Sequence, residues 1–450
     1  MEKFLKFTIK TLSTTLMLAC VFAAILTYSF AYDLPEHVKV GLRYGITAVN
    51  LAAIEADQGL QFGTLEGETF SLISDLQGIK SISAKVQDGK LVISDLNGTI
   101  LERVEANVVC YLIASNSADG GIIKFNNAPY RGGIALQQDS AGKITVINRL
   151  GLEDYLYGVL HQEMSQSNPL EALKAQAIAA RNFTVVRMRT HAKEGFDVCP
   201  NTHCQVYKGY GGEYIKTNQA VDETRNILMY CEETLVQAYY HKNSGGHTEN
   251  SENVWFAALP YLRGVSDPYS PVYPWSANFS AATMQSLLSA GGYNMGVVQT
   301  ISINERTEAD GVLRLEIKGE QGNVILEKEK IRSLLGATLI KSLNFQVINP
   351  SEQSVSLQSA NQLENKSGEI TILSSDGNMN QISVSDVYVS DGNETNRLQG
   401  RQVSQDGFTF SGFGYGHRLG MSQDGAIAMA NQRLGYEDIL KFYYSNIEIK

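Results

Sequence analysis

Cysteine is scarce in this chain, with five residues among 450, at positions 20, 110, 199, 204 and 231. So few cysteines exclude a small scaffold that is held together mainly by disulfides. Basic residues are also in the minority, with 37 Lys and Arg against 47 Asp and Glu, and the formal net charge is −10. No basic stripe is evident, which argues against nucleic acid as the main partner.

Three common catalytic signatures are missing as well. The sequence has no HExxH segment, no GxSxG nucleophile elbow, and no glycine-rich loop that ends in Lys-Ser or Lys-Thr. These absences argue against a zinc peptidase, a serine hydrolase of the α/β type and a nucleotide-binding loop, respectively.

Charge is absent from residue 11 to residue 32, directly after Lys3, Lys6 and Lys10. This stretch is long enough to cross a bilayer as a helix, and the basic flank would stay in the cytoplasm. The alternative is a cleaved signal peptide with a small-x-small site at residues 29–31. We expect an uncleaved anchor, because the apolar stretch exceeds a usual signal core. The location predicted is the cell membrane, single-pass, with the bulk of the chain outside the cytoplasm.

The pattern of elements predicts an α+β fold: a β-rich core with a long buried helix, an N-terminal membrane anchor and an inserted smaller domain. Residues 350–406 are rich in Ser, Asn, Gln and Gly and form either a loosely structured insertion or a small polar β layer. The predicted segments are an anchor or signal at 1–32, a β-rich N-terminal part at 33–150, a catalytic core at 151–280, an inserted α+β segment at 281–349, the polar insertion at 350–406, and the C-terminal part of the core at 407–450.

The most informative stretch is Tyr155–Arg181, in which a single acid, Glu163, precedes a long and largely apolar helix. Asn168 as the N-cap and Pro169 as the first helical residue would begin this helix, which should end near residue 189. Glu163 would then lie on the loop that enters the helix. An acid in this place is either a general acid/base or a surface or capping carboxylate.

Two basic residues, Lys174 and Arg181, stand seven positions apart on one face of this helix. A helix that is apolar on nearly every face is normally buried, and a buried cation needs an anionic partner. That partner is Glu163, another carboxylate, or a ligand.

Two thiols and two imidazoles fall within fourteen residues: His191, Cys199, His203 and Cys204. They suit a tetrahedral zinc site, and because four protein ligands would leave no open position, such an ion would be structural. The spacing is not that of a standard zinc finger. The alternatives are a Cys199–Cys204 disulfide, which an exported protein permits, and four unrelated side chains.

Two glycine-rich segments suit ligand binding. Residues 238–255 combine aromatic rings, which could stack on sugars, with a Ser-Gly-Gly turn that allows close backbone approach, although a tight turn with core aromatics explains them equally well. Residues 412–430 form a glycine-rich loop that leads into a helix. Ser422 is better explained as the N-cap of that helix than as the hydrolase partner of His417.

Taken together, these motifs resemble the family of stage II sporulation protein D and the related amidase enhancer LytB. The resemblance covers nearly all of residues 37–450, with 350–406 the least familiar part. One departure is Asn168-Pro169, where many members have Trp-Pro. The segments that carry the resemblance are, in order, YLYGVLHQEM, EALKAQAIAAR, CPNTHCQVYKG, SGGHTE, PYLRGVSDP, and GYGHRLGMSQDGA with ILKFYY.

The resemblance implies a membrane-anchored peptidoglycan lytic transglycosylase that acts in spore engulfment or cell-wall remodelling, on glycan strands already stripped of stem peptides. It implies Glu163 as the catalytic acid and structural zinc in the segment that holds the cysteines and histidines. Its implied partners are glycan strands, a cell-wall amidase and other membrane-anchored envelope proteins. The side chains predicted to contact substrate are Lys174, Arg181, Tyr240, Ser244, His417 and Gln423.

Lys174 and Arg181 are expected to hold the lactyl carboxylate that a stripped sugar exposes. Two other functions remain open. One is a non-catalytic enhancer that binds wall glycan and activates an amidase, and the other is a scaffold in an envelope complex.

Overall fold

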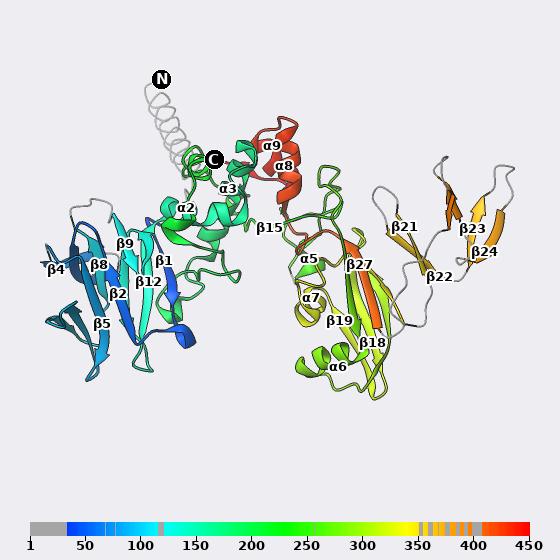
Figure 1. The fold of residues 1–450 in the computed structure, drawn as a ribbon. Helices are drawn as coiled ribbons and strands as arrows, with labels where there is room; N and C mark the ends of the chain where they lie inside the picture. The colour runs from blue at the N-terminus through cyan, green and yellow to red at the C-terminus, as the bar shows by residue number, and fades with distance from the viewer. Residues whose placement is uncertain are drawn as a thin grey trace, which may run out of the picture. The chain divides into compact units, whose positions relative to one another are not determined.

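The computed structural model describes residues 34–67, 69–76, 78–115, 121–255, 257–350 and 407–450, together with six short strands between 354 and 397 (Figure 1). By contacts, the chain divides into residues 1–36 and residues 37–450. The anchor predicted at 1–32 lies outside the described residues. Among the helices that are described, none is long and apolar enough to cross a membrane.

Two six-stranded antiparallel sheets form the part before residue 152. Strands β11 and β12 of the first sheet contact β2, β6 and β9 of the second, so the two sheets pack as a sandwich. The order in the first sheet is β1 (His37–Arg43), β12 (Ile144–Gly151), β11 (Gly133–Gln138), β8 (Cys110–Ala114), β3 (Leu60–Glu66) and β4 (Thr69–Leu76). The order in the second is β10 (Ala128–Arg131), β9 (Ile122–Phe125), β2 (Leu51–Glu55), β5 (Ser81–Gln87), β6 (Lys90–Asp95) and β7 (Ile100–Val104).

A layer of helices follows the sandwich, and the long helix α3 (Leu170–Arg187) is at its centre. Helix α3 contacts four others: α2 (Leu152–Glu163), α4 (Ile215–Asp222), α8 (Gln423–Asn431) and α9 (Tyr436–Tyr443). Its alanines at 172, 175, 177, 179 and 180 are fully buried, and their small side chains allow this close packing on several faces. The fold is therefore mixed helix and sheet and mostly β, with the long buried helix that the sequence predicts.

The predicted start of α3 is wrong by one residue. Pro169 has an extended backbone (φ −57°, ψ 143°) and is the N-cap, so the helix begins at Leu170 and has no side-chain cap. Asn168 lies outside the helix. The end at Arg187 comes two residues before the predicted end.

The part from residue 274 onward has a hydrophobic core of its own. Two sheets and two helices surround a cluster of buried aromatic and aliphatic side chains, with Phe279, Phe345, Phe408 and Phe410 among them. The first sheet has the order β16 (Pro274–Ser280), β27 (Gly407–Phe413) and β20 (Phe345–Ile348), and the second has β17 (Val298–Arg306), β18 (Val312–Gly319) and β19 (Gly322–Glu327). The helices are α6 (Ala281–Ala290) and α7 (Glu329–Leu335).

The described strands between 354 and 397 form three antiparallel hairpins, each a two-stranded sheet. This agrees with the expectation of β structure in this polar stretch. The hairpins are β21 (Ser354–Gln358) with β22 (Leu363–Ser367), β23 (Glu369–Leu373) with β24 (Met379–Ser383), and β25 (Tyr388–Ser390) with β26 (Thr395–Arg397).

The C-terminal residues return to the helical layer through short strand pairs. Strand β28 (Met421–Ser422) runs parallel to β15 (Tyr240–His241), and β29 (Glu448–Ile449) pairs with β13 (Met229–Cys231), which also pairs with β14 (Thr234–Leu235). A short helix, α5 (Ser251–Val254), follows the Ser-Gly-Gly turn.

A buried arginine joins three separate segments of the chain. Arg418 is 1% exposed, and its Nη1 lies 3.2 Å from Oε1 of Glu249. Its guanidinium also donates to the carbonyl oxygens of Ser244 and His247 beside the Ser-Gly-Gly turn, and to that of Ala309 in the β17–β18 turn. These bonds fix the glycine-rich loop before β28 to both turns.

We predict that Arg418→Met lowers the free energy of unfolding by about 3–5 kcal/mol, because Glu249 is left buried without its cation. Urea denaturation followed by circular dichroism measures this change. The matched control is Arg314→Met on β18, where the arginine is half exposed and its ion pairs with Glu305 and Glu327 lie at the surface. The control should lose less than about 1 kcal/mol, and equal losses in the two variants would contradict the prediction.

Candidate functional site

Glu163 is the last residue of α2, and the expectation that it lies on the loop entering α3 is wrong. Its carboxylate accepts hydrogen bonds from two neutral groups. Nε2 of Gln423, the first residue of α8, donates to Oε2 of Glu163 over 3.4 Å, and the hydroxyl of Tyr240 on β15 is the second partner. The structure thus brings together three predicted site residues that lie up to 260 positions apart.

The surroundings of Glu163 favour its protonated form. Burial raises the pKa of Glu163 above its ordinary value, and the hydrogen bonds from Tyr240 and Gln423 oppose that rise because they stabilise the carboxylate. Among the described residues, no cation contributes to the shift. Glu163 is therefore not paired with Lys174 or Arg181.

A buried glutamine, Gln205, which directly follows the candidate metal ligand Cys204, orients Tyr240. Nε2 of Gln205 donates to the Tyr240 hydroxyl over 3.0 Å, while Oε1 of Gln205 accepts from Thr184 (2.7 Å) and from Tyr155 (3.3 Å). Because the Tyr240 oxygen accepts a hydrogen bond from Gln205, its own O–H is left to donate to Glu163.

On the other side of the acid, Oε1 of the fully buried Gln176 accepts from Nε2 of Gln423 over 3.4 Å. Nε2 of Gln176 has no hydrogen-bond partner among the residues that the structure describes. Sequence reasoning missed Gln176, Gln205 and Tyr155. A signal existed for Gln176, as a neutral polar residue in a buried helix, whereas the bonds of Gln205 depend on contacts between distant segments.

Arg181 does not contact substrate, so that prediction is wrong. It is fully buried, and its Nε and Nη2 donate to the two carboxylate oxygens of Glu153 over 2.9 and 2.7 Å. The carbonyl oxygens of Val221 and Ile227 accept further bonds from its guanidinium. Of the three partners that the sequence left open for Arg181, the structure selects another carboxylate.

Lys174 also has carboxylate partners within the chain, and neither is Glu163. Its Nζ lies 2.9 Å from Oε1 of Glu171 and 2.7 Å from Oε2 of Glu223. Lys174 thus has two acids of its own chain as partners in this structure, and its use as a clamp for a substrate carboxylate stays a prediction.

Ser244 is buried and closes a turn. It has no exposed surface, its Oγ accepts from the backbone nitrogen of Gly246 over 3.2 Å, and its hydroxyl bonds to the carboxylate of Asp267. The prediction that it contacts substrate is wrong, since a ligand cannot reach it. Ser422 is the N-cap of α8, as predicted, with its Oγ accepting from the backbone nitrogen of Gly425.

Five half-buried rings form what we call the aromatic wall: Phe183, Tyr239, Tyr240, Trp255 and His417. Trp255 lies 4.2 Å from Tyr239 and 5.4 Å from His417 between ring centroids. Phe183 lies 5.8 Å from Tyr239 and 6.3 Å from Tyr240. The predicted site residues Tyr240 and His417 are thus members of one wall, and Tyr240 connects that wall to Glu163.

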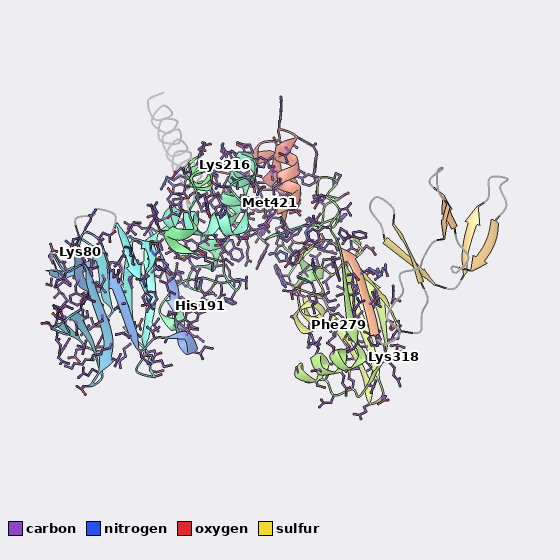
Figure 2. All side chains as sticks on the ribbon, viewed as in Figure 1. Lys80, His191, Lys216, Phe279, Lys318 and Met421 are labelled. Atoms are coloured by element: carbon purple, nitrogen blue, oxygen red, sulfur yellow. The ribbon has the colours of Figure 1, made fainter. Side chains whose placement is uncertain are left out.

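The four predicted metal ligands come together. The ligand atoms of His191, Cys199, His203 and Cys204 all lie within 4.8 Å of one another (His191 is labelled in Figure 2). Nδ1 of His203 is 3.5 Å from both sulfur atoms. Cys199 and Cys204 are free thiols, so the disulfide alternative is not formed.

The surroundings of this cluster suit a metal ion. Nε2 of His191 is buried with no hydrogen-bond partner, as an unused ligand atom would be, while its Nδ1 lies 3.8 Å from a carboxylate oxygen of Glu194. A carboxylate behind a ligating imidazole is a common outer partner in metal sites. Two sulfurs and two imidazole nitrogens make a set that suits tetrahedral coordination.

His241 is a buried neutral histidine next to the aromatic wall. Its Nδ1 lies 3.0 Å from the carbonyl oxygen of Leu419, which can only accept, so Nδ1 carries the proton. Its Nε2 is buried without a partner. Burial, His417 and Arg418 hold the pKa of His241 well below its ordinary value, and burial lowers the pKa of His417 to about 3.

We predict that the free energy of unfolding falls as the pH drops below about 6.5, because unfolding exposes histidines that then take up protons. The contribution of each histidine is present above that pH and is lost on acidification towards its folded pKa, by up to about 1.4 kcal/mol per pH unit. His241→Asn keeps a donor for Leu419 but cannot titrate, so the slope between pH 6.5 and 4.5 should be shallower than in the wild type. Urea denaturation at several pH values measures this slope, and an unchanged slope would refute the prediction.

Comparison with known proteins agrees with this geometry. Residues 140–230, which contain Glu163, α3 and the metal cluster, match the SpoIID family model, described as stage II sporulation protein. Residues 213–363 match a model described only as a domain of unknown function.

Three relatives each cover about two thirds of the chain. An uncharacterized protein of Brachyspira hyodysenteriae is 29% identical over 68% of this chain and 68% of its own length. The stage II sporulation protein D of Bacillus amyloliquefaciens is 28% identical over 67% of this chain and 75% of its own length. The amidase enhancer of Bacillus subtilis is 29% identical over 64% of this chain but only 39% of its own length. The match of residues 140–230 and the similarity to two sporulation proteins of this name support the stage II sporulation protein D family.

Proposed function

We propose that this protein is a peptidoglycan lytic transglycosylase, anchored in the cell membrane by residues 1–32, with the remainder of the chain outside the cytoplasm. The observation that carries the proposal is the half-buried Glu163 carboxyl, whose pKa is raised by desolvation and which accepts hydrogen bonds from the neutral donors Tyr240 and Gln423. A general acid that works near neutral pH needs this kind of raised pKa.

The reaction needs only one carboxyl group. Glu163 gives its proton to the glycosidic oxygen as the bond from that oxygen to the anomeric carbon breaks. The C6 hydroxyl of the same sugar then attacks the anomeric carbon, and its proton passes to the Glu163 carboxylate. The product has a 1,6-anhydro end, and the enzyme returns to its starting protonation state.

This chemistry fits the composition of the site. A hydrolytic glycosidase usually works with a pair of carboxylates that flank the scissile bond. Among the described residues, the groups that shift the pKa of Glu163 include no second carboxylate. The hydrogen bonds from Tyr240 and Gln423 strengthen when Glu163 becomes charged, so they stabilise the anion that forms as the bond breaks.

The aromatic wall supports a glycan as the substrate, because flat, half-buried rings bind sugar faces by apolar contact while polar groups at their edges fix orientation. Phe183 contacts both Tyr240 and Tyr239, and Trp255 lies between Tyr239 and His417 in the same series of ring contacts. We propose glycan strands stripped of their stem peptides as the substrate, and a cell-wall amidase as the functional partner that removes those peptides.

Zinc is the metal that we propose for the cysteine and histidine cluster. His191, Cys199, His203 and Cys204 would hold it, and with four protein ligands it would supply structural cross-linking. Gln205 directly follows Cys204 in the chain and orients Tyr240. A metal that fixes this segment therefore supports the hydrogen bond from Tyr240 to Glu163.

A second candidate function is that of a non-catalytic amidase enhancer, and the similarity to the Bacillus subtilis protein of that name favours it. In that case the wall would bind glycan, and Glu163 would serve as a structural residue.

We predict that the purified full chain in detergent converts peptide-free glycan strands to products with 1,6-anhydro ends, and that Glu163→Gln abolishes this conversion. Mass spectrometry of the products measures both results. The wild-type rate should fall as the pH rises through the raised pKa of Glu163, because the acid must start protonated.

Other outcomes separate the alternatives. Products with ordinary reducing ends would mean hydrolysis and would contradict the single-acid mechanism. If neither protein cleaves glycan but both increase the activity of an added amidase, the enhancer function holds. Glu163→Gln should remain folded, because the amide has nearly the size and shape of the carboxyl that it replaces.

We predict one zinc ion per chain, by elemental analysis, and a lower unfolding temperature after removal of the metal with a chelator. Cys199→Ser should lose the metal and unfold at a similarly lowered temperature. Cys231→Ser, at a buried cysteine outside the cluster, is the control and should keep the metal. Full metal content in the Cys199 variant would refute the ligand set.

A further inference from the structure

Arg187, the last residue of α3, is a cation without an anionic partner in the part of the chain that the structure describes. Arg181 and Arg225 in the same helical layer each pair with a carboxylate. Arg187 makes no such ion pair, and its Nε is buried without a hydrogen-bond partner. A buried guanidinium nitrogen with no acceptor is unfavourable unless something else supplies one.

The surroundings of Arg187 place it on the aromatic wall. Its guanidinium lies over the ring of Phe183, with the central carbon 5.6 Å from the ring centroid. Its charge also acts on the hydroxyl of Tyr239. Since Phe183 contacts both Tyr239 and Tyr240, Arg187 lies at one side of the wall while Glu163 is reached through Tyr240 at another.

A guanidinium stacked on an aromatic ring keeps its edge free for a planar anion. Arg donates two parallel N–H groups that match a carboxylate, and stacking pre-orients them. Aromatic faces beside such a fork suit a sugar ring that carries an acidic substituent. A neutral sugar would contact the faces of the aromatic rings but would give the parallel N–H groups of the guanidinium no anionic acceptor.

The geometry points to Arg187 as the residue that binds the carboxylate of an acidic sugar lying along the aromatic wall. The inference rests on the proposed function for the identity of the ligand as a cell-wall glycan. In such a glycan the acid is either the free lactyl carboxylate of a stripped muramic acid or a carboxylate of an attached stem peptide. Arg187 thus takes the role that the sequence suggested for Arg181, six residues earlier on the same helix.

Binding measurements test this inference without relying on turnover. Isothermal titration calorimetry uses the full chain in detergent, with Glu163→Gln to prevent cleavage. The ligands are a neutral chitooligosaccharide, a peptide-free glycan fragment of the same length, and the same fragment with stem peptides. Arg187→Met keeps the apolar stem on Phe183 but removes the fork, and Arg187→Lys keeps the charge alone. Arg189→Met, at an exposed arginine two residues further on, is the matched control.

We expect Arg187→Met to weaken binding of the peptide-free fragment by about 10-fold to 100-fold, the range of a lost charged hydrogen bond, and to change chitooligosaccharide binding by less than about twofold. Arg187→Lys should give an intermediate loss of affinity. Arg189→Met should bind as tightly as the protein that carries Glu163→Gln alone, which is the parent of these variants. A larger loss on the peptide-bearing fragment than on the stripped one would assign the carboxylate to the peptide.

Equal weakening for neutral and acidic ligands would overturn the inference, because Arg187 would then act through packing alone. Loss of bound metal in Arg187→Met without selective loss of acidic glycan would also overturn it, since Arg187 would then serve to balance the nearby Cys204 sulfur. If the parent protein binds the fragments but the wild type cleaves none, the proposed chemistry fails while the inference stands. If the parent binds none of the three ligands, both fail.

Discussion

The buried ion pair between Arg181 and Glu153 is the contact on which the helical layer depends. Glu153 lies in the first turn of α2, and Arg181 lies in the middle of α3. The same guanidinium reaches carbonyl groups at the end of α4 and before β13. The backbone nitrogen of Asn226 also donates to Glu153, so both charges have several partners. Because removal of one partner would leave a charge in an apolar interior, the pair fixes how these elements meet.

The helices joined by this ion pair position Glu163, and neutral side chains around it influence its pKa. Helix α2 ends at Glu163, so any rotation of α2 about the ion pair would move the carboxyl relative to Tyr240 and Gln423. Two opposing influences act on its proton: burial favours the neutral acid and the two hydrogen bonds favour the anion. A cation in place of either neutral donor would shift the balance towards the carboxylate, which would weaken a general acid. The glutamines and the tyrosine around Glu163 therefore suit the chemistry better than Lys or Arg would.

Structural features that depend on residues close together in the sequence could be predicted from the sequence. The buried helix α3, the gathering of His191, Cys199, His203 and Cys204, and the cap at Ser422 follow from residue spacing and composition. The error on Arg181 has a different origin. Its neighbours in the sequence show that it needs an anion, but the anion is Glu153, 28 residues earlier on another helix. Ser244 and Gln205 were misjudged or missed because their partners come from segments that only the folded chain brings close.

The pairing of β20 with β27 has a consequence for how this chain tolerates changes in length. Ile348 and Thr409 are direct neighbours across these strands, so the two ends of the intervening stretch lie next to each other in this sheet. Closing a flexible loop between fixed ends becomes less favourable only with the logarithm of its length, by about 0.6 kcal/mol for each doubling. A much shorter or longer stretch here would therefore have little effect on the stability of the sheet. The side chains of β20 and β27 belong to the common core, and at those positions the same freedom does not exist.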